Sequence, residues 1–204
     1  PPNHFSTRAL VEKWFGGIAR GAVVEPIAPP AAILTGVQKK TLTDKVALPR
    51  LYLAWLTPRF YAPGDSALDI TSSVLAGGKN SRLYKRLVYD MQIAQDVSAF
   101  QQSAALGSQF QIVATARSGH TAEELKTVID EELDRLRRDG PDPREVQRAI
   151  NQMEASFYER MEKVGGFGGK ADQLNAYKFA GGGPDYFAED LARSALSAGR
   201  LVRI

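Results

Sequence analysis

The sequence has two histidines, His4 and His120, and only His120 stands among acidic residues at a spacing close to that of a zinc site. In the H-x-x-E-H arrangement, two imidazoles on one helical face hold the metal and a carboxylate polarises the bound water. The run HTAEE at residues 120–124 has Glu124 where the second histidine would stand. Thr121 and Glu124 also match a helix capping box, which accounts for Glu124 and places His120 before the helix. We therefore predict no metal site in this chain, and the absence of cysteine removes thiolate ligands as well.

The glycine-rich run GGFGGKA at residues 165–171 is the second candidate for ligand chemistry. The run does not match a Walker loop. Val164 stands at the position that needs Gly, and Ala171 stands at the position that needs Ser or Thr. The run does match the loose G-x-G-x-x-A dinucleotide pattern, but that pattern must follow a strand of a parallel unit. Here it follows a predicted helix, so we favour a hinge or a turn between helices over a phosphate loop.

No nucleophile or acid–base pair stands out elsewhere. The sequence has no G-x-S-x-G nucleophile elbow, and one predicted helix carries a group of carboxylates that we expect to be solvated: Glu123, Glu124, Asp130, Glu131 and Glu132. The 26 basic and 23 acidic residues form no block of like charge, which argues against nucleic-acid binding. No apolar run approaches the roughly 20 residues of a membrane span. The lack of cysteine fits both cytosol and periplasm, and we prefer a periplasmic over a cytoplasmic location.

The elements that must position these residues begin with a short helix. Leu10, Val11, Trp14 and Phe15 recur at helical spacing after Ser6, which we predict as the N-cap, and Gly16 ends the run. Residues 23–31 are proline-rich and predict an extended linker. We place a domain boundary there, with residues 1–22 before it and residues 32–204 after it.

The main part of the chain predicts a sheet with many helices. Its strands are expected at Ile33–Lys45, Leu51–Leu56, Asp96–Ala104 and Gln109–Ala116. Leu51–Leu56 is apolar on both faces, which favours a central strand. Helices are expected at residues 65–76, 81–91, 122–139, 143–161, 170–179 and 184–196. Because strands and helices do not alternate, the order predicts an α+β fold, with an antiparallel-rich sheet and helices packed on one side.

Four segments, in this order, resemble the second half of insulinase/pitrilysin-type (M16) zinc peptidases, especially bacterial ones: LPRLYLAWLTP at 48–58, VLAGGKNSRLYKRLV at 74–88, QIAQDVSAF at 92–100 and DPREVQRAINQ at 142–152. LVEKWFGGI at 10–18 resembles the closing helix of the preceding, zinc-bearing half. In that family, two α/β halves close like a clamshell around a peptide, and the first half carries H-x-x-E-H and a downstream Glu. The resemblance implies that residues 1–22 are the tail of the first half and that residues 32–204 are a non-catalytic domain without its last helix and strand. The helix SALDITSSVLAG, in the place of the zinc motif, has no histidine.

Active relatives carry an Arg and a Tyr that reach the cleft, in a run similar to SRLYKxLRxxxGLAYxV. Aligned without gaps, those positions are Val88 and Gln95 here, so the resemblance implies no catalytic residue in this chain. Arg82 and Tyr89 have the same spacing in another register, and we expect Arg82 to anchor the start of its helix instead. The candidates for residues that face substrate are Arg82, Val88 and Gln95.

The resemblance leaves two classes of function. In the first, the chain is the non-catalytic half of a zinc endopeptidase that encloses and positions a peptide, with zinc held by a catalytic M16 half in the same chain or in a separate subunit. In the second, the chain is a structural or docking subunit with a peptidase-like fold and no proteolytic role. In both, this chain alone is no enzyme and holds no cofactor, and homodimerisation is left open.

Overall fold

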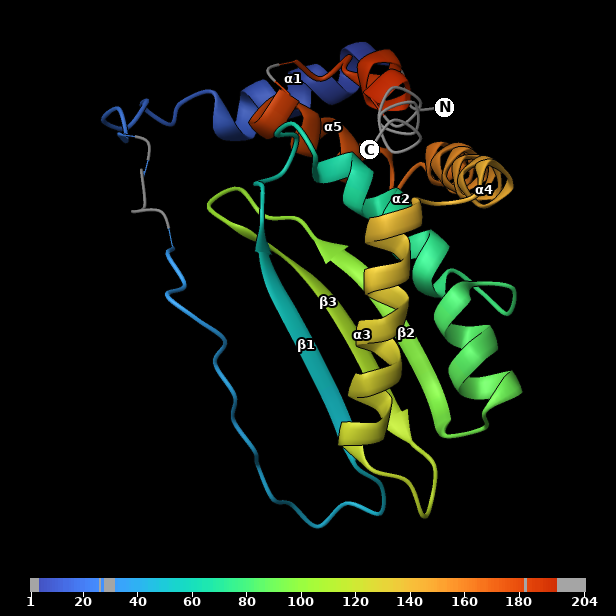
Figure 1. The fold of residues 1–204 in the computed structure, drawn as a ribbon. Coiled ribbons are helices and arrows are strands. Elements are labelled where there is room, and N and C mark those ends of the chain that lie inside the picture. The colour runs from blue at the N-terminus through green and yellow to red at the C-terminus, as the bar shows by residue number, and fades with distance from the viewer. Residues whose placement is uncertain (1–3, 26, 28–31, 182, 194–204) are drawn as a thin grey trace. The chain divides into compact units, whose positions relative to one another are not determined.

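The structure, a computed structural model, describes residues 4–25, 27, 32–181 and 183–193 (Figure 1). It divides into two compact units, residues 1–30 and residues 31–204, and each is described by itself. The first unit holds helix α1 (His4–Phe15). This helix begins before Ser6, so the predicted N-cap was wrong and Ser6 lies inside the helix. An ion pair of 2.8 Å joins Arg8 to Glu12 one turn later, and the backbone N–H of Gly16 donates to the Glu12 carbonyl at the helix end.

The second unit is built on a three-stranded antiparallel sheet. Its strands are β1 (Arg50–Thr57), β2 (Ala94–Gln102) and β3 (Ser108–Ala116), in the spatial order β1-β3-β2. Strand β3 is central, and its Ile112 lies between Leu53 of β1 and Ala99 of β2. The pairing of β2 with β3 is shifted at Ala94–Asp96, which makes a bulge at the start of β2.

Two strand predictions were wrong. Residues 32–45 form no strand, and their apolar side chains are exposed, including Val37 at 95%. Without a neighbouring strand to pair with or a face to bury, alternation of Leu and Thr with Lys does not hold a strand in place. Strand β1 is at the edge of the sheet and not in its centre, because β3 is its one partner among the described strands. Its alternate side chains, such as Leu51 and Leu53, pack on the core.

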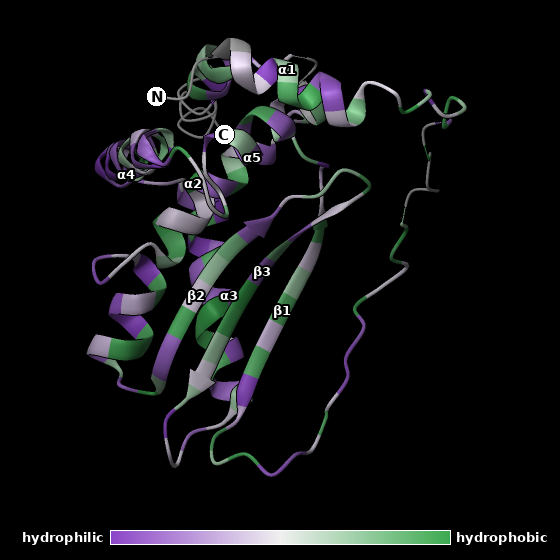
Figure 2. Cartoon of the chain, turned by 180° about the vertical axis from the view of Figure 1, so that it is seen from behind, coloured by the Kyte–Doolittle hydropathy of each residue, from purple (hydrophilic) through white to green (hydrophobic). Residues whose placement is uncertain are grey.

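The helices of the second unit are α2 (Asp65–Ala76), η1 (Tyr84–Asp90), α3 (Ala122–Asp139), α4 (Pro143–Glu162), α5 (Lys170–Ala176) and η2 (Tyr177–Gly181). Residues 187–193 form a further short helix. Of the helix predicted at 184–196, residues 184–186 form a turn, and residues 194–196 lie outside the described residues. Helix α3 runs across one face of the sheet in Figure 1, and the view from behind in Figure 2 shows the opposite face without a helix of this unit over it. The predicted α+β fold, with an antiparallel sheet and helices on one side, is confirmed.

The core lies between the sheet and these helices. On β3 the side chains of Phe110, Ile112 and Ala114 are buried, and they pack with Leu125 and Ile129 of α3. A second cluster joins α2 to α4 through Ile70, Val74, Val146 and Ala149. Burial of this apolar surface is the main favourable contribution to folding.

Two helices begin with capping boxes, and the one predicted at Thr121 and Glu124 is confirmed. Thr121 and Glu124 form a capping box at α3, and Asp142 and Glu145 form another at α4, with Pro143 at its first position. The helix predicted at residues 81–91 is wound mostly as a π-helix over η1. This wider winding moves Met91 off the face that it would share with Leu83 and Leu87, and Met91 is 45% exposed while the two leucines are buried. None of the described helices is long and apolar enough to cross a membrane.

Candidate functional site

Arg82, the first of the predicted substrate-facing residues, is held in an ion pair with α4. Its Nε and terminal amino group donate to the Glu145 carboxylate at 2.7–3.1 Å, and the same amino group donates to the Gly140 carbonyl at 3.2 Å. The hydrogen bonds with Glu145 raise the pKa of Arg82. Burial opposes ionisation of Glu145, but its bonds with Arg82 and with the Asp142 N–H lower its pKa overall. Because Glu145 also closes the α4 capping box, Arg82 ties the start of its helix to the start of α4.

Val88 and Gln95 lie in different surroundings. The Val88 side chain belongs to the hydrophobic core and is 9% exposed. Gln95 is exposed in the bulge at the start of β2. Tyr89, from the alternative register, is also exposed. No hydrogen bond joins Arg82, Val88 and Gln95 to one another among the described residues. Contact of these three side chains with substrate stays a prediction.

The carboxylates expected to be solvated on α3 do not all face water. Glu132 is buried, with a side chain 3% exposed, and it binds Arg86 and Arg135 at 2.9 Å each. The expectation failed because Arg86 comes from η1, 46 residues earlier, and a helix pattern alone does not show such a partner. His120 lies before α3, as expected, with its Nδ1 3.4 Å from Glu124. Within the described residues no group of three or more His, Cys, Asp or Glu side chains could hold a metal ion.

The glycine-rich run also has a local explanation. It follows helix α4 and ends at α5, whose N-cap is Gly169. Gly166 and Gly168 have φ angles of 80° and 73°, which suit glycine in a tight connection. The Gly168 N–H donates to the Asp172 carboxylate at 2.8 Å, so an internal acid already occupies a backbone donor that a phosphate would need.

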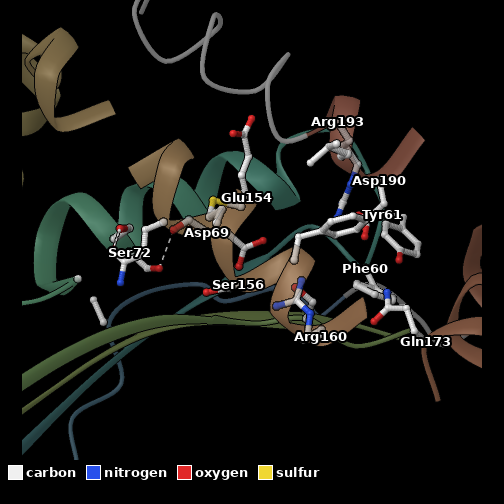
Figure 3. Close-up of a pocket in the computed structure, with 18 residues that line it drawn as sticks. Phe60, Tyr61, Asp69, Ser72, Glu154, Ser156, Arg160, Gln173, Asp190 and Arg193 are labelled. Atoms are coloured by element: carbon white, nitrogen blue, oxygen red, sulfur yellow. Dashed lines mark hydrogen bonds and ion pairs between the residues drawn. The ribbon is translucent and has the colours of Figure 1, made fainter. Parts of the chain in front are cut away.

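A cavity of about 540 Å³, which the sequence did not indicate, lies at one end of the second unit (Figure 3). Its walls come from the loop after β1, from β2 and the residues just after it, from α2, α4 and α5, and from residues 187–193. The polar and aromatic side chains in these walls include Phe60, Tyr61, Asp69, Glu154, Arg160 and Arg193.

The fully buried carboxylate of Asp65, the first residue of α2, holds this end of the domain together. It accepts hydrogen bonds from the Tyr61 N–H at 3.0 Å, from Ser103 at 2.5 Å, from Gln101 at 3.1 Å and from Arg193 at 3.1 Å. These donors come from the loop after β1, the end of β2 and residues 187–193. Removing a carboxylate from water costs free energy unless its lone pairs find other donors. Here four donors take the place of water.

Arg193 and the tyrosines complete this network. Arg193 also binds Asp190 at 3.1 Å, and its guanidinium lies 4.3 Å from the centre of the Tyr61 ring. In Figure 3 these three side chains stand close together. Tyr177 is buried and donates to Asp190 at 2.7 Å, and burial together with that acid raises the pKa of Tyr177. Tyr177 is therefore a neutral structural donor near neutral pH.

Asp69, one turn after Asp65 on α2, has different chemistry. Among the described residues its carboxylate accepts no hydrogen bond. Burial raises its pKa to about 7, and the nearby charge of Asp65 and Asp190 adds to this, whereas Arg193 and Arg160 act in the opposite direction. Two aspartates four residues apart on a mostly apolar helix were the signal in the sequence that could have indicated this pair.

The Arg82 ion pair can be tested by stability. We expect Arg82→Ala to lower the free energy of unfolding by about 2–3 kcal/mol, because it leaves Glu145 and the Gly140 carbonyl without a charged donor. Arg8→Ala is the matched control, since it breaks an exposed pair and should cost less than about 0.5 kcal/mol. Urea unfolding of both variants is the measurement. A folded Arg82→Ala chain of unchanged stability would show that Arg82 is no anchor.

The pKa of Asp69 predicts a dependence of stability on pH. The carboxyl has a pKa of 3.8 without the fold and about 7 in the fold, so the folded state keeps a proton that the unfolded state releases between these values. The contribution of Asp69 to stability is then fully present at low pH and is lost as the pH rises toward 7. Asp69→Asn should match the parent near pH 4 and be more stable than the parent near pH 8, measured by urea unfolding against the exposed control Asp44→Asn. Parallel pH profiles of Asp69→Asn and the parent would contradict the assignment.

Comparison with known proteins places the chain in a family. A family model described as "Peptidase M16 inactive domain" matches residues 3–153. A protease from Helicobacter pylori has a similar structure, with a TM-score of 0.74 and 20% identity over 97% of this chain and 50% of that protein, so this chain spans about half its length. The peptidase M16 inactive domain from Pseudomonas fluorescens has a TM-score of 0.59 and 19% identity, over 71% of this chain and 34% of that one.

A third similar structure is the inactive peptidase domain of a protein named as a zinc protease in Bordetella parapertussis. Its TM-score is 0.65 and its identity 18%, over 79% of this chain and 87% of that one. At these identities the similar structures show a shared fold. A comparison with curated proteins found no match. The family model covers well over half of the residues, and the chain therefore belongs to the M16 peptidase family, as one of its inactive domains.

Proposed function

We propose that this chain is the non-catalytic half of a zinc-dependent endopeptidase, which encloses and positions a peptide for a partner half that carries H-x-x-E-H. The observation that carries the proposal is the match of residues 3–153 to the inactive domain of M16 peptidases. In this reading, residues 1–22 are the tail of the catalytic half and residues 23–31 are the linker between the halves. Zinc belongs to the partner half, because α2, in the place of the zinc motif, offers no histidine.

The uncovered face of the sheet supports a role in lining a chamber. It presents apolar side chains at Tyr52, Leu56 and Phe100, which are 63%, 49% and 39% exposed. Beside them, Gln102 accepts hydrogen bonds from Gln109 at 2.8 Å and from Gln111 at 3.0 Å. A wall that mixes aromatic surface with amides can contact many peptide sequences without selecting one charge.

The experiment is complementation in trans. The catalytic half alone, this chain alone and the two mixed are assayed with a fluorogenic peptide. We expect no cleavage by this chain, and turnover by the mixture at least about tenfold above the catalytic half alone, because a half-open site positions substrate poorly. Gln95→Ala should lower turnover of the mixture by up to about tenfold if its amide holds substrate, whereas Val88→Ala should change it by less than about threefold.

Two results would contradict the proposal. Equal turnover with and without this chain, while the two proteins still associate, would assign it the docking role. Loss of turnover in a stably folded Arg82→Ala variant, with Val88→Ala unaffected, would make Arg82 and Tyr89 the working pair.

A further inference from the structure

We propose that the cavity beside α2 binds a cationic group of a peptide, either a Lys or Arg side chain or a free N-terminal ammonium, with Asp69 as its counter-ion. The choice of a peptide as the ligand rests on the proposed function, although the cavity lies on the helix-covered side of the sheet, where the core-facing Ala99 lines it, and not on the uncovered face. The cavity, of about 540 Å³, is within the range of small-ligand sites, roughly 300–1,000 Å³.

The charge balance of the cavity favours a cation. Arg193 and Asp190 line it, but they are bound to each other, and Arg193 is also bound to Asp65. Three further charged side chains line it without an ion pair among the described residues: Asp69, Glu154 and Arg160. Two of these three are acids, so the cavity has an excess of negative charge once Asp69 is ionised.

Asp69 and Arg160 differ in how far their side chains are buried. Asp69 is partly buried on α2, and desolvation disfavours its ionised form. Arg160 is exposed on α4 and remains hydrated. A partly desolvated carboxylate without a partner gains more from an opposite charge than a hydrated guanidinium does. A positively charged ligand group therefore gains most in this cavity, by pairing with the carboxylate of Asp69.

The aromatic wall supports the same ligand. The Phe60 and Tyr61 rings stack with centres 3.9 Å apart, and the Tyr61 ring already carries the Arg193 guanidinium at 4.3 Å. Ring faces attract lysine and arginine cations through their quadrupole. Phe60, which lines the cavity, offers such a surface to the aliphatic stem of a basic side chain.

The test is an NMR titration of the full chain near pH 8 with three pentapeptides. The first has a central Lys and blocked ends. The second has norleucine instead of Lys and blocked ends, and the third has norleucine with a free amino terminus. We expect the lysine peptide, the free-amine peptide or both to bind with Kd below about 1 mM, and the blocked norleucine peptide to bind at least about tenfold more weakly, because it cannot pair with a carboxylate.

The variants locate the site. Asp69→Asn keeps the shape of the side chain and should weaken binding of the cationic peptides at least about tenfold. Asp44→Asn removes the same charge from an exposed residue, whose carboxylate accepts a hydrogen bond from the Lys45 N–H, and it should leave binding unchanged. Shift changes should centre on residues 60–61, 69–73 and 156–160. Thermal unfolding of each variant verifies the fold.

Three results would overturn the proposal: equal binding of the lysine and blocked norleucine peptides, no binding of any peptide at about 10 mM, or a folded Asp69→Asn chain that binds as the parent does. The titration uses this chain without a catalytic half. If complementation in trans fails but the titration shows binding, the proposed function alone is rejected. If complementation succeeds but the titration shows no binding, the proposed cation site alone is rejected.

Discussion

A single buried carboxylate, that of Asp65, determines how one end of the inactive domain is assembled. Four donors from three parts of the chain converge on it. A carboxylate inside a protein is stable only when such donors are in place. The loop after β1, the end of β2 and residues 187–193 are therefore fixed relative to α2 by one interaction. Because these same segments form the walls of the cavity, the cavity depends on Asp65 as well.

Helix α2 thus carries two carboxylates with opposite roles. Asp65 accepts four hydrogen bonds and acts in structure, whereas Asp69, four residues later, accepts none from the described residues and has a pKa of about 7. By resemblance, α2 stands where the zinc-bearing half of an M16 peptidase has its metal ligands. In this domain the helix supplies no histidine, and its first acid, Asp65, holds the fold instead. This division is compatible with a domain that positions a peptide without cleaving it.

The sequence predicted what depends on local chemistry. The capping residue Thr121 acts on neighbouring backbone groups, so its role can be read from a few residues, although the same chemistry was wrongly predicted for Ser6. It did not predict what depends on distant partners. The strand predicted at residues 33–45 has no partner strand among the described residues, and β1 looked central although it pairs on one edge only. The burial of Glu132 and the cavity around Asp69 come from side chains that are far away in the sequence. The Arg82 anchor was expected, but its partner Glu145 was not.

Amide hydrogen exchange of Asp65→Asn against the parent tests the role of this carboxylate most directly. The substitution keeps the shape and removes the charge that four donors share, so residues 60–62, 101–104 and 187–193 should lose protection together. The amides of α3, which packs on the sheet through Leu125 and Ile129, should keep theirs. A folded variant in which these three segments exchange as slowly as in the parent would contradict the account.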